Sequence, residues 1–526
     1  ALLLNNCVSP KRRVLIMSAA QFPERHIFTP IVIVGSGFAG IGTAIRLQQK
    51  GFNDFLILEQ ANNFGGTWRD NTYPGAECDV PSHLYSFSFE PNPHWSKAFA
   101  PQKEIQKYLL HCAQKHKLAS KTLFNAEVVN ASFNETKGEW TVTLADGCTV
   151  RCRLLIMGNG GLSKPSYPVI EGQQSFQGKI MHTARWHESF DYAGKKVAVI
   201  GTGASAIQLI PELAKTAAQV VVFQRTPAWV MPKWDTHFSA HLQQEFADHP
   251  NLRKALRYGI YWGAEAMSMA LIWNSPLAKS MQWLGELHLK TIKDNTLRSK
   301  LTPDYKVGCK RMLISNDYYP AMQRDNVQLV TNGIKKIDST GIHSQLGEHY
   351  PVDAIVYATG FQVNVAGSPF PITGLDNRQL MTEWTTGSEA YKGININGYP
   401  NLCLLMGPNT AAGHTSVLVY LEGQIEYVLN YTKTLFDLSF KYLDIKKSAQ
   451  DSFNKMIQRR MKYTVWTTGC QSWYLTKEGK NSTLWPGFSW EYRLRTAFFN
   501  HDDYERVGAK YQKGVRTKKQ KIITSS

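Results

Sequence analysis

The sequence has few cysteines for its length and no long uninterrupted apolar segment. Its eight cysteines are spaced irregularly among 526 residues, which argues against a disulfide framework and fits a reducing cytoplasm. His and Cys do not cluster at metal-ligand spacing, so we predict no metal site. From Tyr258 to Ala278 only Glu265 is charged. Asn274 and Pro276 also interrupt this stretch, and its apolar part falls short of the roughly 20 residues that a membrane span needs.

The excess of basic residues is spread along the chain. The formal charge of +18 raises the question of nucleic-acid binding, but no nucleic-acid motif accompanies it, and we predict no nucleic-acid partner. Residues 506–526 are expected to form a solvated basic tail with at most weak attraction to anionic lipid. In residues 1–16 the positive side chains follow Leu2–Leu4 instead of preceding them, unlike a signal peptide, so we interpret this segment as an extension.

A glycine-rich loop follows the first apolar run, residues 31–34. It has the pattern GxGxxG and opens a helix, and the residues expected to bind a nucleotide are Gly35, Gly37, Phe38, Ala39 and Gly40. The glycines allow a tight turn, approach of backbone N–H groups to a pyrophosphate, and close contact between helix and strand. The next predicted strand, residues 54–58, ends at Glu59, where we expect the carboxylate to accept a hydrogen bond from a ribose hydroxyl.

The same pattern recurs after a second apolar strand, residues 196–200. Here the loop reads GxGxxA, with Gly201, Gly203, Ala204 and Ser205 as candidate nucleotide-binding residues. The strand at 220–223 is followed by Arg225 and Thr226 instead of an acidic residue. A guanidinium can pair with a 2′-phosphate and a hydroxyl can donate to it, so we predict FAD at the first loop and NADPH at the second. The alternative is that Arg225 is a surface side chain without a ligand.

The segment between the two loops carries a second kind of motif. Phe176, Gly178, His182 and Trp186 form the pattern FxGxxxHxxxW, which resembles the fingerprint of the Baeyer–Villiger monooxygenases, class B flavoprotein monooxygenases that depend on FAD and NADPH. Trp186 favours this family over the flavin-containing amine and sulfide oxygenases, which usually carry Tyr or Phe there. The resemblance places His182 in a linker between the two nucleotide domains, where it would orient backbone rather than transfer protons.

A further stretch after the first loop also resembles this family. It reads GGxWxxxxYPGxxxD, and its candidate site residues are Gly66, Thr67, Trp68, Tyr73 and Asp79. Glycines let the backbone approach a flat cofactor, and Trp68 can lie along a nicotinamide ribose or a flavin edge. Asp79 can orient a cation buried near the flavin ring. The alternative is a turn-rich loop with a core tryptophan.

That cation is predicted to be Arg311. The run from Gly308 to Arg311 resembles the segment in which the family places its active-site arginine. A guanidinium stays protonated in proteins and would stabilise a flavin peroxide anion and the oxyanion that forms when it adds to a ketone. Lys310 would point elsewhere and join Arg225 on the 2′-phosphate. A solvated Lys-Arg pair is the alternative.

The resemblance, which runs from about residue 31 to residue 485, also implies the fold. We expect an α/β protein with two doubly wound, Rossmann-like, three-layer nucleotide-binding domains. The FAD domain would comprise residues 27–170 and, together with a C-terminal cap, residues 351–505. The NADPH domain would comprise residues 171–350, with a helical insertion at about 234–301.

Three smaller elements complete this expectation. Alternation of apolar and polar residues predicts a small antiparallel sheet at 124–154. A turn at Ala358, Thr359 and Gly360 would carry the chain between the two domains. Trp473 lies in a segment that resembles the region folding over bound NADP+, and is a candidate lid contact or a core residue.

The resemblance implies that the enzyme converts ketones to esters or lactones with NADPH and O2 through a C4a-peroxyflavin. The substrate would be a small lipophilic ketone, and the helical insertion would line a core or tunnel or make shallow membrane contact. Two alternatives are a flavin-containing N- or S-oxygenase and a non-catalytic flavoprotein that responds to NADPH. The ketone class and the oligomeric state are not predicted.

Overall fold

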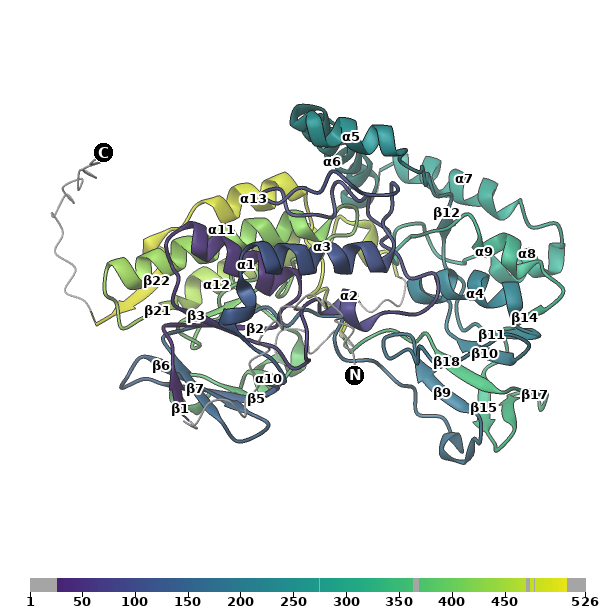
Figure 1. The fold of residues 1–526 in the computed structure, drawn as a ribbon, viewed down its shortest axis with the longest axis horizontal. Coiled ribbons are helices and arrows are strands. Elements are labelled where there is room, and N and C mark those ends of the chain that lie inside the picture. The colour runs from purple at the N-terminus through teal and green to yellow at the C-terminus, as the bar shows by residue number, and fades with distance from the viewer. Residues whose placement is uncertain (1–25, 274, 363–368, 470–473, 477, 509–526) are drawn as a thin grey trace, which may run out of the picture.

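The computed structural model (Figure 1) describes residues 26–273, 275–362, 369–469, 474–476 and 478–508. The predicted extension at 1–16, Trp473 and most of the predicted basic tail lie outside these residues. The tail was predicted to begin at residue 506, but strand β22 (Tyr504–Val507) pairs with β21 (Tyr442–Ile445). The chain therefore remains in a sheet for two residues beyond the predicted limit.

The first nucleotide unit is built on a parallel sheet of five strands. Their order is β20 (Leu402–Leu404), β8 (Leu154–Met157), β2 (Ile31–Val34), β3 (Phe55–Leu58) and β4 (Thr122–Leu123). Every residue of β2 and β8 is buried, as expected for central strands that are covered on both faces. One face packs against helices, chiefly α1 (Phe38–Gln49), α3 (Gln102–Lys115) and α11 (Val417–Asp437).

A second sheet covers the other face of this parallel sheet. Its order is β1 (His26–Phe28), β7 (Thr149–Cys152), β6 (Glu139–Leu144), β5 (Val128–Asn134) and β19 (Ile372–Thr373). Strands β5, β6 and β7 are antiparallel, which confirms the small antiparallel sheet predicted from alternation. Val32 and Val34 of β2 pack toward Trp140 of this layer, whereas Ile31 and Ile33 face the helices.

The second nucleotide unit repeats this plan. Its parallel sheet has the order β14 (Val327–Val330), β11 (Gln219–Phe223), β10 (Lys196–Ile200), β18 (Ala354–Tyr357) and β9 (Lys179–His182). Helices α4 (Ala204–Thr216) and α9 (Tyr318–Met322) cover one face. The other face is covered by an antiparallel sheet that the sequence did not predict, β15 (Ile334–Ile337), β16 (Gly341–Ser344) and β17 (His349–Pro351).

Strand β18 corrects the predicted domain limit at residue 351. It pairs in parallel with both β10 and β9, so it belongs to the second sheet and not to the first. Its four residues are apolar and fully buried, which suits a central strand of either sheet, and only the pairing decides between them. The chain therefore leaves the second unit after Tyr357, at the turn 358–360.

Helices fill the predicted insertion between β12 (Val230–Met231) and β13 (Leu313–Ile314). They are α5 (Ala240–Asp248), α6 (Pro250–Ile272), α7 (Leu277–Leu289) and α8 (Asn295–Leu301), and α5 and α6 rise above the junction of the two units in Figure 1. Among the described residues, no helix has the length and hydropathy needed to cross a membrane.

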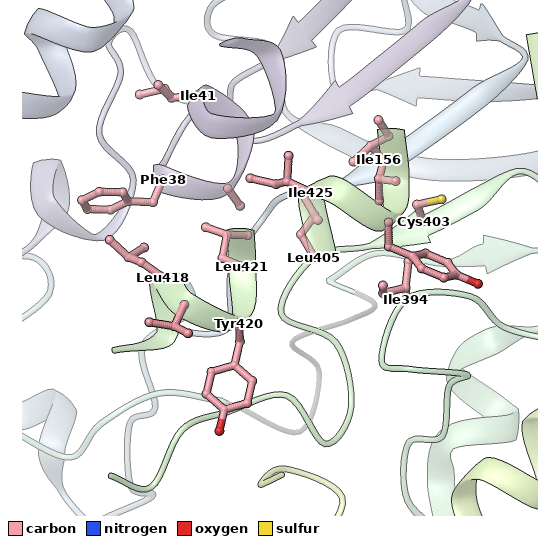
Figure 2. Close-up of a cluster of buried hydrophobic side chains, with 14 of the residues drawn as sticks. Phe38, Ile41, Ile156, Ile394, Cys403, Leu405, Leu418, Tyr420, Leu421 and Ile425 are labelled. Carbon is pink, nitrogen blue, oxygen red and sulfur yellow. The ribbon is translucent and has the colours of Figure 1, made fainter. Parts of the chain in front are cut away.

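Four further α-helices lie in the described part of the chain. A short helix, α2 (Thr67–Asp70), follows the first nucleotide loop. The C-terminal part adds α10 (Leu380–Glu383), α12 (Lys447–Met461) and α13 (Ser489–Ala497). Figure 2 shows that Phe38 and Ile41 of α1 share one core with Ile156 of β8 and with Leu421 and Ile425 of α11. Segments separated by more than three hundred residues therefore build the first unit together.

Five of the six cysteines in the described part of the chain are free. Those that are free and described are Cys78, Cys112, Cys148, Cys152 and Cys403. Cys309 is disulfide-bonded, which the irregular cysteine spacing did not predict.

One buried carboxylate joins the insertion to the C-terminal part. Glu265 of α6 accepts hydrogen bonds from the backbone N–H and the Oγ of Ser489, the first residue of α13. Its Oε1 also lies 3.3 Å from Nε2 of His414, which precedes α11. A negative charge at a helix N-terminus is favourable, because the unpaired N–H groups point toward it.

We predict that Glu265→Ala lowers the free energy of unfolding by about 2–3 kcal/mol, because the substitution leaves a buried amide and a buried imidazole without their shared acceptor. The urea midpoint of the flavin-loaded protein measures this loss. Glu286→Ala is the matched control, since Glu286 is an exposed residue of α7 whose carboxylate accepts a hydrogen bond from Gln282 one turn earlier. Equal midpoints for the two variants would contradict the role given to Glu265.

Candidate functional site

The first glycine-rich loop is shaped by two contacts that only glycine permits. Gly35 has φ +94°, and a Cβ there would lie 2.7 Å from the carbonyl oxygen of Gly158. A Cβ on Gly40 would lie 1.9 Å from the carbonyl oxygen of Gly35. The loop therefore turns tightly against the end of β8, and the first turn of α1 packs directly beneath it.

The start of α1 is left open to a ligand. Gly37 is the N-cap, and no described side chain caps the helix, so its first N–H groups lack partners within the helix. Across from it lies Gly66, whose Cα would be 3.7 Å from a Cβ on Gly37. Phe38 and Ala39 turn inward and are buried. Two glycine backbones facing each other beside free N–H groups fit the pyrophosphate of a dinucleotide.

Glu59 is held more tightly than the sequence indicates. Its Oε2 accepts from the N–H (2.9 Å) and Oγ (2.7 Å) of Ser36, and its Oε1 accepts from Ala61 N–H and from Arg69 Nη1, each at 2.9 Å. A carboxylate offers about four acceptor positions. A ribose hydroxyl would have to share or displace one of these donors, so ribose binding by Glu59 stays a prediction.

The second loop repeats the geometry of the first. Gly201 has φ +112°, and its Cβ would lie 2.5 Å from the carbonyl oxygen of Ala358. Gly203 caps α4 with open space around it and without a capping side chain among the described residues. Ala204 and Ser205 form the first turn of α4. The carbonyl of Ala358 therefore lies against the first glycine of the second loop, as the carbonyl of Gly158 does in the first unit.

Two cations lie near the end of β11, as the NADPH prediction requires. Burial lowers the pKa of Lys310, and the nearby charge of Arg225 lowers it further, while Asp304 acts in the opposite direction. The Lys310 ammonium also lies 4.5 Å from the centre of the Tyr305 ring. Arg225 is exposed, and the carbonyl of Thr226 accepts from Thr202 Oγ1. Two neighbouring cations fit a dianionic phosphate group.

The segment from Gly65 to Asp79 connects the two units. Gly66 faces the first loop, whereas Tyr73 donates from its hydroxyl to Oε1 of Gln208 in α4, at 2.7 Å. Gly75, with φ +79°, lies so close to α4 that a Cβ would be 2.4 Å from the carbonyl oxygen of Gln208. Sequence reasoning missed Gln208, because a polar residue inside a helix carries no signal of its tertiary partner.

Trp68 is mainly a core residue. Its side chain is buried, its ring lies edge-on to Tyr85, and its Nε1 donates to the Tyr85 hydroxyl at 3.2 Å. Thr67, the first residue of α2, is half-buried. Contact of either residue with a cofactor stays a prediction.

Asp79 and Arg311 form an ion pair although 232 positions separate them in the sequence. Nη2 of Arg311 donates to Oδ2 of Asp79, and this carboxylate raises the pKa of the guanidinium above its ordinary value. The Arg311 side chain remains 45% exposed and Asp79 21% exposed. Arg311 therefore carries a fixed positive charge with an open side.

Tyr474 also belongs to this site. Burial raises its pKa to about 12, and the charge of Arg311 opposes that rise. Sequence reasoning considered only the neighbouring Trp473, which lies outside the described residues. The resemblance of that segment to an NADP+-covering region was the available signal, but it did not indicate which aromatic residue interacts electrostatically with the arginine.

The fingerprint segment packs against the second sheet. A Cβ on Gly178 would lie 2.5 Å from the ring of Phe176 and 2.4 Å from the Asp353 carbonyl, so glycine is required there. His182 ends β9 beside Tyr357 of β18 and accepts from Ala184 N–H through Nδ1 at 3.0 Å. Burial lowers the pKa of His182 to about 4.

The imidazole of His182 is fully buried, and burial disfavours its charged form, so its position suits the orienting role that the resemblance implies. The ring lies beside Phe361, directly after the turn 358–360. Thr359 fixes that turn by donating from Oγ1 to the carbonyl of Ser166, and Gly360 has φ +79°. Trp186 packs against Phe190 and Tyr192 on the outside of this segment.

Comparison with known proteins identifies the family. A family model described as pyridine nucleotide-disulphide oxidoreductase matches residues 32–257. A Baeyer-Villiger monooxygenase of Pseudomonas aeruginosa is 43% identical over 498 residues, which cover 94% of each chain. A Baeyer-Villiger monooxygenase of Streptomyces coelicolor is 39% identical over 504 residues, covering 93% of this chain and 96% of that protein.

Solved structures agree in fold. An oxidized steroid monooxygenase bound to NADP superimposes with a TM-score of 0.82 at 29% identity, covering 91% of this chain and 99% of that one. OTEMO in complex with FAD and NADP gives a TM-score of 0.81 at 28% identity, with the same coverage. These matches confirm the predicted α/β fold with two Rossmann-like units. The identity that spans nearly the whole chain, together with both sequence motifs, shows that the chain belongs to the Baeyer–Villiger monooxygenase family.

Proposed function

We propose that this chain converts a lipophilic ketone to an ester or lactone, and that Arg311 stabilises the negative charge that develops on the reacting oxygen. The observation that carries the proposal is the Asp79–Arg311 ion pair, whose guanidinium keeps an open side. Its partner carboxylate ends the segment that touches the first nucleotide loop through Gly66 and helix α4 through Tyr73.

Family membership makes the chain a flavin-dependent monooxygenase that uses FAD and NADPH. Bound FAD, once reduced by NADPH, supplies the activated oxygen from O2. The residues present fit these cofactors. We assign the pyrophosphate of FAD to Gly37, Gly66 and the free N–H groups of α1, and that of NADPH to Gly203 and the start of α4.

Specificity for NADPH is assigned to Arg225 and Lys310, assisted by the hydroxyl of Thr226. Charge-assisted hydrogen bonds to a phosphate are roughly twice as strong as neutral ones, and they have no counterpart in NADH. The first unit has Glu59 at the equivalent strand end, which would repel a 2′-phosphate.

Arg311 acts by preorganised charge. The guanidinium is held in place before the reaction, so no reorganisation is needed when oxyanion charge develops on the ketone oxygen. Charge of this kind is worth about 3–4 kcal/mol of transition-state stabilisation. Asp79 is a positioning residue, because it touches the guanidinium and keeps it oriented.

The proposal that the substrate is a lipophilic ketone is supported by the exposed surface of the helical insertion. Helix α6 exposes Tyr258, Trp262 and Met267, and α7 exposes Trp283. An apolar surface of this kind supports delivery of a lipophilic ketone, and aromatic rings suit shallow contact with a membrane surface. A cytoplasmic location stays a prediction.

Replacing Arg225 tests the cofactor assignment. We predict that Arg225→Ala raises the KM for NADPH at least tenfold, since about 1.4 kcal/mol of lost binding is one factor of ten. The KM for NADH should hardly change. Steady-state oxidation of each cofactor measures both constants, with Lys215→Ala, an exposed cation of α4 paired to Glu212, as the control. Equal preference for NADPH and NADH in the unmodified protein would refute the assignment.

Replacing Arg311 tests the chemistry. We expect Arg311→Ala to fold, hold FAD and oxidise NADPH, yet to form ester roughly 10²–10³ times more slowly, because the oxyanion loses its fixed charge. The consumed NADPH should then appear as hydrogen peroxide. Product analysis by mass, peroxide assay and flavin absorbance separate these steps.

Arg378→Ala is the control for this substitution, since Arg378 forms an Arg–Glu pair with Glu383 in the first unit. Near-normal ester formation by Arg311→Ala would show that the catalytic cation lies elsewhere. Loss of flavin from Arg311→Ala would show that this arginine serves the fold.

A further inference from the structure

Three potential metal ligands meet on the antiparallel sheet of the second unit. Asp338 directly follows β15, His343 lies in β16 and His349 in β17, and the two histidines are directly opposite each other in the strand register. Their ligand atoms all lie within 4.8 Å of one another. The spacing in sequence, four and five intervening residues, gave no sign of this cluster because it depends on strand pairing.

The imidazoles converge on a single oxygen. Nε2 of His343 lies 2.5 Å, and Nε2 of His349 3.5 Å, from Oδ2 of Asp338. The two rings are stacked with centroids 4.4 Å apart and planes 21° from parallel. A tetrahedral zinc ion with bonds of about 2.0–2.1 Å holds its ligand atoms roughly 3.3–3.4 Å apart, so small side-chain shifts would bring these three atoms to coordinating positions.

The Asp338 carboxylate is already oriented for this task. Its Oδ1 accepts from the N–H groups of Thr340 and Gly341, each at 2.8 Å, and from Thr340 Oγ1 at 2.9 Å. These bonds leave Oδ2 directed at the two histidines. Buried Ile342 and Tyr350 anchor the strands that carry the imidazoles.

An ordinary surface ion pair explains this arrangement less well than a metal site does. A surface ion pair needs one imidazole at the carboxylate. Here a second imidazole stacks on the first, and its Nε2 lies 3.5 Å from the same carboxylate oxygen and 3.3 Å from Thr340 Oγ1. The three side chains are between 23% and 35% exposed, so an ion can reach them from solvent and keep a water molecule as its fourth ligand.

We propose that Asp338, His343 and His349 bind one divalent transition-metal ion of the zinc class. Two imidazoles and one carboxylate suit Zn²⁺, Cu²⁺ or Ni²⁺, whereas Mg²⁺ and Ca²⁺ prefer oxygen ligands. The ion would not take part in ketone oxidation, and its site lies on the β15–β17 sheet, on the face of the second unit's parallel sheet opposite α4.

The bound ion would brace the turn that supports the fingerprint segment. Gln177, between Phe176 and Gly178, donates from its N–H to the carbonyl of Ser339 at 3.1 Å. Ser339 is the residue next to Asp338. Metal binding should therefore raise the thermal midpoint of the protein, because an ion that binds only the folded state stabilises it.

Calorimetric titration tests the proposal directly. The flavin-loaded, tag-free protein is stripped with EDTA, desalted and titrated with ZnCl2, and we expect one ion per chain. Asp338→Asn, His343→Ala and His349→Ala each remove or neutralise a ligand, so each should weaken binding by more than the roughly tenfold to hundredfold that loss of an outer-shell partner costs. His249→Ala, which removes an exposed histidine that lies 3.6 Å from Glu245, should bind as the unmodified protein does.

Absence of binding by the unmodified protein would overturn the proposal, and so would equal affinities in all the variants. If a variant loses its flavin, electron paramagnetic resonance of Cu²⁺ bound to the unmodified protein tests instead whether the two histidines coordinate the ion. Coupling to two imidazole nitrogens is expected, and a spectrum without nitrogen coupling would contradict the site. Displacement of Zn²⁺ by excess Mg²⁺ would show that the ion class is wrong.

Discussion

The contact between Asp79 and Arg311 is the interaction on which the rest of the site depends. Asp79 ends a segment that lies against the first loop through Gly66 and against α4 through Tyr73. Arg311 follows the helical insertion and precedes β13. The position of the guanidinium therefore depends on how the two nucleotide units and the insertion pack against one another. A charge placed this way can be fixed before substrate arrives, which is what electrostatic catalysis requires.

The two nucleotide units solve the same packing problem and differ in charge. In each, the first glycine of the loop approaches a carbonyl at the end of a neighbouring strand, Gly158 in one case and Ala358 in the other. In each, the following helix starts at an uncapped glycine. What separates them is the strand end, which carries Glu59 in the first unit and Arg225 in the second. The shape of each loop fits a dinucleotide, and we assign the choice between FAD and NADPH to the charge at the strand end.

Local patterns in the sequence predicted most of this architecture, and non-local pairing accounts for what they missed. Each of these features appears as a pattern of neighbouring residues: the glycine loops, the apolar strands and the alternation at 124–154. Strand β18 was assigned to the wrong unit because a buried apolar run does not indicate which strands it pairs with. Gln208 and Tyr474 were missed because each acts through an interaction made only in the folded chain, a hydrogen bond for Gln208 and an electrostatic interaction for Tyr474. The cluster of Asp338 with two histidines escaped for the same reason.

A double-substitution cycle on the ion pair tests the central claim most directly. The fraction of oxidised NADPH that ends as ester is measured for the unmodified protein, Asp79→Ala, Arg311→Ala and the double variant. If Asp79 acts only by positioning Arg311, the double variant should match Arg311→Ala, and the two effects should not add. Effects that multiply independently would contradict the account, because they would show that Asp79 and Arg311 serve separate functions.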